Sequence, residues 1–270
     1  MLKFSHLFPA SSLREYDIRG IVGETLHKED AFAIGRTFGS IVAKAGGRRV
    51  ATGRDGRLSS PELSASLIEG LMASGMEVID IGCGPTPMLY FTATTEGTDG
   101  AVMVTGSHNP ANYNGFKMML GKKPFFGKQI QELGATAARG DVVEEAKGSV
   151  TQKDVREAYV TRLLQDWDGG DRRLNIVWDS GNSAAGEVLA MLTQRLPGNH
   201  TILNGAIDGR FPAHHPDPTV AKNLDQLIAA VKKQRADIGI AFDGDADRIG
   251  VVDDSGTILW GDQILVLLAR

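Results

Sequence analysis

The sequence is poor in cysteine and in aromatic residues. Cys83 is the single cysteine among 270 residues, and Phe, Trp and Tyr together make up only 6%. One thiol cannot form an intramolecular disulfide, which excludes a disulfide framework and fits a reducing compartment. Because Cys83 stands between Gly82 and Gly84, a small packing residue is the favoured interpretation, and a catalytic thiol is the lesser alternative.

Clustered positive charge and long apolar runs are also scarce. No basic block is longer than Arg48-Arg49 or Lys232-Lys233, and 29 basic against 33 acidic residues give a net charge of −4. This argues against a nucleic-acid partner, which would need a clustered basic surface. The longest apolar run near a terminus, Ile264–Ala269, is far below the roughly 20 residues that span a bilayer. We therefore predict a cytoplasmic protein with neither a nucleic-acid nor a membrane partner.

Glycine, in contrast, is abundant. The 33 glycines among 270 residues, or about 12%, exceed the usual share of roughly 7%. In a chain with 42% hydrophobic and 23% charged residues, which is typical of a folded protein, such a surplus indicates tight turns or backbone that approaches a ligand closely. The glycines expected to serve such loops are Gly20, Gly53, Gly56, Gly106, Gly115 and Gly244.

Strand and helix patterns alternate along the chain, which predicts an α/β fold with a mostly parallel sheet covered on both faces. The helix that begins near Ser59 has capping-box spacing to Glu62 and ends at Gly75. The predicted strands are Arg49–Thr52, Val78–Ile81, Ala101–Val104, Asn175–Trp178, Thr201–Leu203 and Ile238–Phe242. The other predicted helices are Glu29–Ala45, Gln131–Ala138, Val155–Leu164, Ala184–Arg195 and Lys222–Lys233.

The alternation breaks between Lys128 and Ala158, where the chain turns polar and no strand is predicted, and again at a loop over 166–172. We therefore predict two similar three-layer α/β domains with mixed, mostly parallel sheets, over 1–150 and 151–256. The segments Ile249–Val252 and Thr257–Trp260 predict a hairpin or a strand that leads onward. The uncapped apolar segment Gln263–Arg270 reads as a helix cut short, so that 257–270 would be the truncated start of a third domain.

Three carboxylates follow the predicted strand Ile238–Phe242, in the sequence FDGDADR. Asp243, Asp245 and Asp247 stand at every second position, so they turn to one side and repel one another unless a cation lies between them. Hard oxygen ligands of this kind suit Mg²⁺, and a solvated acidic turn is the alternative. An EF-hand fits poorly because Arg248 stands where that loop needs glycine. A haloacid-dehalogenase-type phosphatase fits poorly because Asp247 stands where Thr or Val belongs.

A serine loop with the sequence TGSHNP follows the predicted strand Ala101–Val104. Ser107 stands at the carboxyl end of that strand, where α/β folds place their ligands. Gly106 permits a sharp turn, His108 adds a donor beside the hydroxyl, and Lys117 adds a cation on the next extended segment. No G-x-S-x-G elbow is present, so a serine-hydrolase triad is not indicated. A polar turn closed by Asn-Pro remains the alternative.

Two segments carry arginines that suit an anion. Arg14 and Arg19 stand in REYDIRG, and Arg54 and Arg57 stand in GRDGR directly after a predicted strand. Arginine forks match phosphate bidentately. For the second pair a salt-bridged surface turn is an equal alternative. Carboxylates, a serine and several arginines together indicate phosphate chemistry, because a dianion needs neutralisation by both a metal and guanidinium groups.

The sequence resembles the α-D-phosphohexomutase family, and within it the bacterial phosphomannomutase/phosphoglucomutase branch. Three motifs match in order and spacing: YDIRG at Tyr16–Gly20, TGSHNP at Thr105–Pro110 and DGDADR at Asp243–Arg248. Asn114–Lys117 and Phe211–Pro218 add to the match. The phosphoglucosamine mutase branch differs, with a GTDGIRG-type opening and DGDGDR. The resemblance covers essentially the whole chain.

The resemblance implies an enzyme that interconverts hexose 1-phosphate and hexose 6-phosphate, of mannose and/or glucose. The route would pass through a phosphoserine and a 1,6-bisphosphate, with Mg²⁺ and glucose 1,6-bisphosphate or mannose 1,6-bisphosphate as cofactors. The implied catalytic residues are Ser107, Lys117, Arg19 and His108. The implied substrate-binding residues are Tyr16, Arg19, Lys117 and Arg248. The implied metal ligands are Ser107, Asp243, Asp245 and Asp247. A family-like monomer is expected, with a dimer as the alternative.

The chain also departs from the family, which has four domains. Its GExSGH-type sugar loop and RxSxTEP-type phosphate loop have no counterpart here. Since remote binding energy positions the reacting end of a substrate, residues 1–270 are expected to be weakly active or inactive as a mutase. The alternatives are a Mg-dependent phosphosugar phosphatase and an inactive half-site that binds phosphate and metal.

Overall fold

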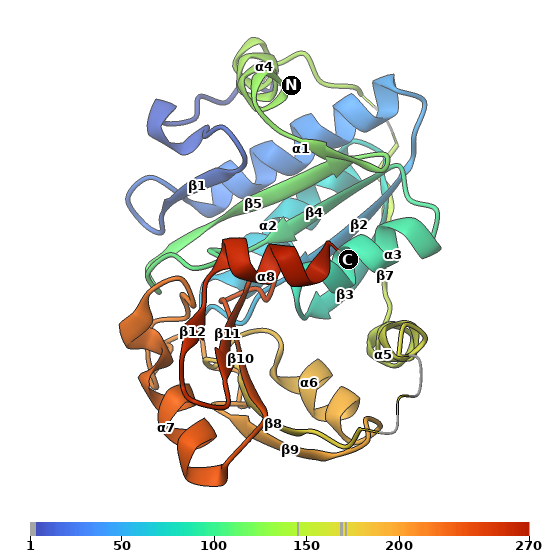
Figure 1. Ribbon diagram of the computed structural model, residues 1–270. Coiled ribbons are helices and arrows are strands. Elements are labelled where there is room, and N and C mark those ends of the chain that lie inside the picture. The colour runs from blue at the N-terminus through green and yellow to red at the C-terminus, as the bar shows by residue number, and fades with distance from the viewer. Residues whose placement is uncertain (1–3, 145, 168–169, 171, 270) are drawn as a thin grey trace. The chain divides into compact units, whose positions relative to one another are not determined.

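The computed structural model describes residues 4–144, 146–167, 170 and 172–269 (Figure 1). The chain divides into two compact units: Met1–Gly106 with Pro110–Val155, and Ser107–Asn109 with Arg156–Arg270. The three residues Ser107–Asn109 thus belong to the second unit, although the chain on either side of them belongs to the first. Residues 168, 169 and 171 of the predicted loop lie outside the described residues, as do the two ends of the chain at 1–3 and 270.

A mixed sheet forms the first unit, in the strand order β1-β5-β4-β2-β3-β7, with β6 paired to β5. Pairing is parallel from β4 through β2 and β3 to β7, and antiparallel where β5 meets β4, β1 and β6. The strands are β1 (Ile18–Ile21), β2 (Arg49–Arg54), β3 (Glu77–Cys83), β4 (Gly100–Val104), β5 (Tyr113–Leu120), β6 (Lys123–Phe125) and β7 (Ser149–Gln152).

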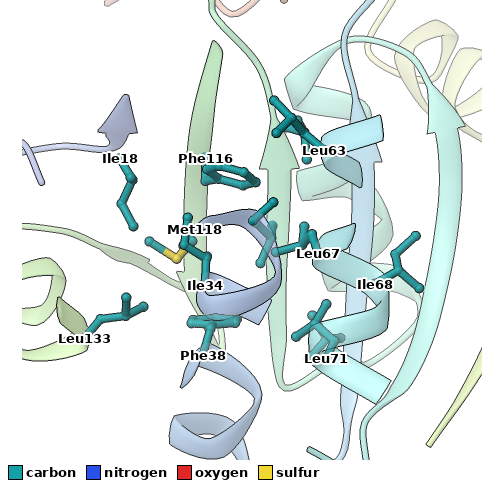
Figure 2. Packing of buried hydrophobic residues seen from close by; sticks show 14 of the residues in the cluster. Ile18, Ile34, Phe38, Leu63, Leu67, Ile68, Leu71, Phe116, Met118 and Leu133 are labelled. Carbon is teal, nitrogen blue, oxygen red and sulfur yellow. The ribbon is translucent and has the colours of Figure 1, made fainter. Parts of the chain in front are cut away.

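Helices cover both faces of this sheet (Figure 1). The buried side chains of α1 and α2 pack on alternate strand residues such as Val50, Val102 and Phe116, which places them on one face (Figure 2). On the other face α3 packs against β2 and β4. Burial of such side chains stabilises a fold by roughly 1.5–3 kcal/mol each. The helices are α1 (Lys28–Lys44), α2 (Ser60–Ala73), α3 (Thr86–Thr95) and α4 (Lys128–Arg139), preceded by the 3₁₀ turn η1 (Ala10–Ser12).

The first unit corrects two of the sequence predictions. The predicted strand-free stretch contains β7, an exposed strand that pairs in parallel with β3 at the edge of the sheet. The four residues of β7 have no alternating apolar pattern, so the sequence does not predict this strand. The predicted capping box at Ser59 is also absent: the Ser59 hydroxyl makes no cap bond and accepts instead from Asn114 Nδ2 at 2.9 Å. A tertiary contact has therefore taken the place of the local one. The helix α3, too, was not predicted.

The second unit has the strand order β12-β11-β10-β8-β9, with β10, β8 and β9 parallel and β11 and β12 antiparallel. The predicted hairpin is confirmed by β11 and β12. The helix α7 packs its leucine and valine side chains on β8, β10 and β11. The strands are β8 (Asn175–Asp179), β9 (Asn199–Leu203), β10 (Ile238–Phe242), β11 (Ile249–Asp253) and β12 (Ile258–Leu259). The helices are α5 (Arg156–Leu164), α6 (Gly186–Thr193), α7 (Asp225–Gln234) with η2 (Ala221–Leu224) before it, and α8 (Gly261–Leu268).

Both units are thus α/β folds with mixed sheets, as predicted. None of the described helices is long and apolar enough to cross a membrane.

A buried ion pair fixes the carboxyl end of β8. Asp179 is fully buried and accepts hydrogen bonds at 2.9 Å from His214 Nε2, the Gly181 amide and Asn204 Nδ2. Since the other ring nitrogen of His214 lies 3.0 Å from the His215 carbonyl oxygen, which can only accept, both nitrogens carry protons. The hydrogen bond to Asp179 raises the pKa of His214 above its ordinary 6.5, with burial acting in the opposite direction. In the sheet, Asp179 pairs with Ala241 of β10, two residues before Asp243.

The close approach of α1 and α2 predicts an effect of Gly70→Ala. A Cβ at Gly70 would lie 2.1 Å from the Phe32 carbonyl oxygen, and a Cβ at Gly35 would lie 2.1 Å from that of Leu67. Alanine gains roughly 1 kcal/mol of helix propensity over glycine, but overpacking against backbone typically costs about 1–3 kcal/mol. Because the two helices must move apart, we expect a lower free energy of unfolding, measured by urea denaturation. Gly261→Ala in α8, where no atom lies within 4 Å, is the control. An unchanged or raised urea midpoint for Gly70→Ala would contradict the packing argument.

The His214–Asp179 pair predicts a pH dependence of stability. A group whose pKa is raised on folding stabilises the fold fully below its unfolded pKa, and this contribution is lost as pH rises through the raised value. We therefore expect wild type to lose stability as pH rises from about 6.5 upward, and His214→Gln, a donor that does not titrate there, to flatten that slope. Chemical denaturation between pH 6 and 9 measures how the free energy of unfolding depends on pH. The control is His215→Gln, which replaces the exposed neighbouring histidine. Identical slopes for wild type and His214→Gln would refute the assignment.

Candidate functional site

The serine loop begins with a residue in an unusual backbone conformation. Ser107 has a φ of 49°, in the left-handed region, and is 1% exposed. Its hydroxyl donates a hydrogen bond to Asp243 Oδ2 at 2.9 Å, and His108 Nδ1 lies 3.4 Å from the Ser107 Oγ. The serine and the first aspartate, which the sequence placed in separate motifs, are thus in direct contact within the second unit.

The acidic loop connects β10 and β11 and is shaped by its first residue. Asp243 Oδ1 accepts the backbone amides of Asp247 and Arg248 at 3.1 and 3.2 Å, while its own amide donates to the Arg248 carbonyl at 3.3 Å. Ala246 completes the turn with a φ of 54°. Because Oδ1 is used to close the loop, Oδ2 is the oxygen that faces Ser107.

Gly244 brings the acidic loop against the serine loop. A Cβ at this position would lie 2.3 Å from the backbone oxygen of Ser107, and real Cβ atoms do not approach backbone so closely. The glycine surplus predicted close backbone approach to a ligand. At Gly244 the structure shows a close approach of backbone to backbone, which holds the two loops in contact.

The three aspartates fit a single Mg²⁺ ion. Asp243, Asp245 and Asp247 each offer a carboxylate oxygen, and these oxygens lie within 4.8 Å of one another. In octahedral Mg²⁺ coordination at 2.0–2.1 Å, neighbouring ligand oxygens lie about 3 Å apart and opposite ones about 4.2 Å apart, so the three carboxylates would have to close in around one ion. Asp243 and Asp245 are fully buried. Hard carboxylate oxygens with a hydroxyl beside them are the donor set that this cation prefers.

Arg248 hydrogen-bonds to His108, and Asp217 lies near enough for His108 to affect its pKa. Arg248 Nη1 lies within hydrogen-bond distance of His108 Nδ1, at 2.9 Å. Burial acts to raise the pKa of the Asp217 carboxyl, but hydrogen bonds from Thr219 together with the nearby His108 and His215 hold it below its ordinary value. Asp217 was not singled out from the sequence; the Phe211–Pro218 motif that contains it was the available signal.

The first unit brings together Arg19 and Lys117. Arg19 pairs with Gly115 across β1 and β5, and Lys117 stands two residues further along β5, so both residues lie on the sheet face opposite Phe116. Arg19 is 4% exposed, forms an ion pair with Asp17 and donates to the Gly106 carbonyl.

Tyr16 is 76% exposed and stacks on Phe126, with the ring centroids 6.4 Å apart.

The segment GRDGR has neither of its two predicted structures, a turn that presents two arginines to a ligand or a salt-bridged surface turn. Arg57 is ion-paired with Asp55 at 3.1 Å, but the two side chains are 0% and 1% exposed, so this is a buried pair and not a surface turn. Nor does the turn present two guanidiniums for a ligand, because that of Arg57 is enclosed by protein. Arg54 is half-buried and donates to the Asp55 carbonyl at 3.3 Å. Charged residues are rarely buried unless paired, and here the partner stands only two residues away.

Two family models match the chain. Phosphoglucomutase/phosphomannomutase alpha/beta/alpha domain I matches residues 10–142, and domain II matches residues 157–256. The chain is similar to a phosphoglucomutase of Neisseria gonorrhoeae, 47% identical over 95% of this chain and 56% of the relative. It is also similar to a phosphomannomutase/phosphoglucomutase of Pseudomonas aeruginosa, 46% identical over 97% of this chain and 56% of the relative.

The fold is shared with a solved structure. A phosphoglucomutase/phosphomannomutase family protein from Burkholderia thailandensis superimposes with a TM-score of 0.92 at 44% identity, over 97% of this chain and 59% of that one. The chain thus spans little more than half the length of the relatives it matches. With both domain models matched in order and the predicted motifs inside them, the chain belongs to the phosphoglucomutase/phosphomannomutase family, the bacterial branch of the α-D-phosphohexomutases.

Proposed function

We propose that the protein acts as a phosphohexomutase, interconverting the 1-phosphate and 6-phosphate of mannose and/or glucose through phosphorylated Ser107. The observation that carries the proposal is the Ser107 hydroxyl at 2.9 Å from Asp243, within a group of three carboxylates. Membership of the family and the mutase names of relatives at 46–47% identity support it. The contacts of Ser107 support the half-reaction at this residue.

In that half-reaction, the bond between phosphorus and one sugar oxygen of a hexose 1,6-bisphosphate breaks and a bond from phosphorus to Ser107 Oγ forms. Asp243 Oδ2, which already accepts the Ser107 hydrogen bond, is placed to take the proton from Oγ. The leaving sugar oxygen takes up a proton, for which Lys117 is the proposed acid and Arg19 the proposed electrostatic partner. The products are phosphoserine and a hexose monophosphate, and the reverse step onto the other sugar oxygen yields the isomer.

Asp243, Asp245 and Asp247 are the proposed Mg²⁺ ligands, with Ser107 as the fourth. When bound, the ion supplies positive charge that stabilises the metaphosphate-like transition state of phosphoryl transfer. His108 and Arg248, which hydrogen-bond to each other, are proposed to orient the phosphate around Ser107. Tyr16 is proposed to contact the sugar. Glucose 1,6-bisphosphate or mannose 1,6-bisphosphate is the proposed phosphoryl donor.

The remaining parts of the proposal concern the organisation of the chain. Residues 1–150 and 151–256 are assigned as the phosphoserine and metal-binding domains, and 257–270 as the start of a third. A cytoplasmic, monomeric protein whose partner is a small phosphosugar is the proposed setting.

A phosphosugar phosphatase is the second candidate, because it would use the same Ser107 and the same three carboxylates. If phosphoserine at Ser107 passes its phosphoryl group to water, inorganic phosphate appears and no isomer forms. A sugar 1-phosphate assay that follows both the 6-phosphate and inorganic phosphate separates the two functions.

Replacement of the serine tests the nucleophile. Ser107→Ala is expected to abolish phosphoryl uptake from glucose 1,6-bisphosphate in the presence of Mg²⁺, because the only atom proposed to accept phosphorus is removed. Intact-mass spectrometry measures the gain of one phosphoryl group. The control is Ser255→Ala, on the exposed β11–β12 turn, which should behave as wild type. Uptake by Ser107→Ala equal to that of wild type would show that another residue is the nucleophile.

Replacement of one carboxylate tests the metal site. Asp245→Asn keeps the size of the side chain but removes its charge, so we expect Mg²⁺ to bind at least about tenfold more weakly. Isothermal titration calorimetry measures the dissociation constant. Asp254→Asn removes an exposed carboxylate from the β11–β12 turn of the same unit and should leave the affinity unchanged. The metal assignment fails if the two variants bind Mg²⁺ equally well.

A further inference from the structure

We propose that Asp55 and Arg57 are positioning residues: together they form a buried clamp that grips both stems of the serine loop and thereby sets the position of Ser107. The stems are the residues on either side of Ser107–Asn109, and all of their contacts with the clamp lie within the first unit. The kinetic part of this inference rests on the proposed function, whereas its structural part does not.

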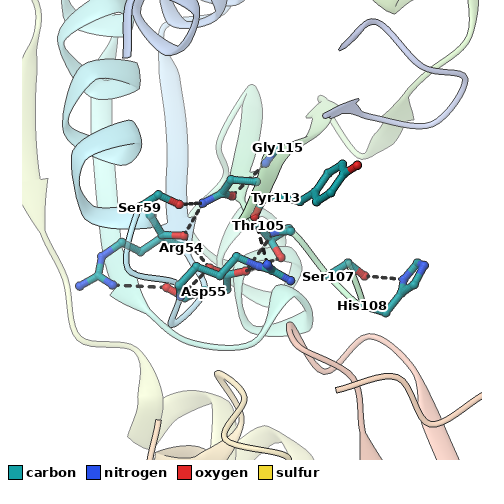
Figure 3. Close-up of polar contacts among 12 residues, drawn as sticks. Arg54, Asp55, Ser59, Thr105, Ser107, His108, Tyr113 and Gly115 are labelled. Atoms are coloured by element: carbon teal, nitrogen blue, oxygen red, sulfur yellow. Dashed lines mark hydrogen bonds and ion pairs between the residues drawn. The ribbon is translucent and has the colours of Figure 1, made fainter. Parts of the chain in front are cut away.

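Asp55 holds the stem that enters the loop. One of its oxygens, Oδ2, accepts hydrogen bonds from the Thr105 hydroxyl at 2.9 Å and from the Gly106 amide at 3.0 Å (Figure 3). The other oxygen accepts from the Arg57 amide and from the Ser60 hydroxyl at the start of α2. The carboxylate thus joins the stem to the first turn of a helix that is packed into the core.

Arg57 holds the stem that leaves the loop. Its Nη1 donates to the carbonyl oxygens of Pro110 at 2.5 Å and Tyr113 at 3.0 Å, while its Nε donates to Asp55 Oδ2 at 3.1 Å. One planar guanidinium therefore links the leaving stem to the carboxylate that binds the entering stem. A lysine ammonium is a single point of charge and has no such fork.

Gly106 is enclosed by these groups immediately before Ser107. Its amide donates to Asp55, its carbonyl accepts from Arg19, and a Cβ on it would lie 2.2 Å from Arg57 Nε. With both of its backbone polar groups bonded and its Cα against the guanidinium, Gly106 has little freedom to rotate. The direction in which the chain enters Ser107 follows from this.

The clamp accounts for the burial of an ion pair beside the serine loop. Burying two charges is unfavourable unless their remaining hydrogen-bonding groups are satisfied, and here the bonds go largely to the two loop stems. Phosphoryl transfer depends on a closely positioned nucleophile, and a displacement of about 1 Å can lower a rate roughly 100-fold. A clamp on both stems supplies that positioning through the backbone on either side of the loop.

Arg57→Lys tests the clamp because it keeps the charge beside Asp55 and removes the fork. We expect amide hydrogen exchange at Gly106 and Tyr113 to accelerate at least about tenfold, since the bonds that fix the stems are lost. We expect phosphoryl uptake at Ser107 to slow by about 10- to 100-fold at saturating glucose 1,6-bisphosphate. The affinity for Mg²⁺ and the exchange of core amides in α1 should stay at wild-type values, which a general loss of structure would not allow.

Arg49→Lys is the matched control. Arg49 is the first residue of β2, the strand that leads into the turn with Asp55 and Arg57, and its Nη1 also donates to a backbone carbonyl, that of Glu96, at 2.8 Å. It should leave both the exchange at Gly106 and the uptake at Ser107 unchanged. If Arg57→Lys does not fold, Thr105→Val takes its place in the test. This substitution removes one hydrogen bond to Asp55 from a fully buried side chain, and we expect exchange to accelerate and uptake to slow in the same way.

The outcomes separate the clamp from the proposed function. Wild-type exchange at Gly106 and Tyr113 in the folded variant overturns the clamp, and faster exchange with undiminished uptake overturns its positioning role. If wild type itself takes up no phosphoryl group, the proposed function fails, while the exchange measurement still decides whether the stems are clamped.

Discussion

Mutual repulsion of three carboxylates is the constraint around which the second unit is built. Asp243, Asp245 and Asp247 present oxygens within 4.8 Å of one another, two of them on fully buried side chains. A loop of this charge keeps its shape only if other contacts hold it. The antiparallel pairing of β10 and β11 fixes both of its ends, and Asp243 Oδ1 uses two backbone amides to close it. The shape of the loop thus rests on backbone hydrogen bonds, and a site ordered in this way binds a ligand at a lower entropic cost.

The first unit places charge in its interior for a different purpose. Asp55 and Arg57 neutralise each other, and the hydrogen bonds that remain go to backbone atoms on both sides of the serine loop. A hydrophobic pair of equal volume would pack there at a lower desolvation cost, but it would bind neither stem. The charges are thus explained by the directional bonds they make, which apolar side chains cannot make.

The sequence revealed the parts of the protein whose cause is local. Asp243, Asp245 and Asp247 stand within five residues, so their clustering follows from spacing alone, and the helix now assigned to α1 follows from its apolar periodicity. Contacts distant in sequence could not be predicted in this way. The β7 edge strand has no apolar pattern, and the hydroxyl of Ser59 is taken by Asn114, 55 residues away. His214 and Asp179 are 35 residues apart, and no local rule joins them.

Arg57 shows a further limit on prediction. From the sequence alone, Arg57 could equally be a phosphate ligand or part of an exposed salt bridge. Both predictions assume that its charged side chain faces solvent. The Arg57 side chain is 0% exposed because a carboxylate, two carbonyl groups and a glycine enclose its guanidinium. The two carbonyl groups and the glycine follow β4 in the sequence, whereas Arg57 precedes it. Only the tertiary structure could bring them together.

Two glycines show why composition alone was ambiguous. Gly106 lacks a side chain because a guanidinium occupies the space, whereas Gly244 lacks one because the carbonyl oxygen of Ser107 does. The first contact fixes the residue before Ser107 and the second fixes the backbone of Ser107 itself. Since each glycine makes room for a different neighbour, an added methyl group at either position would displace Ser107 by a different route. At these two positions, glycine is therefore required by neighbouring protein atoms around Ser107.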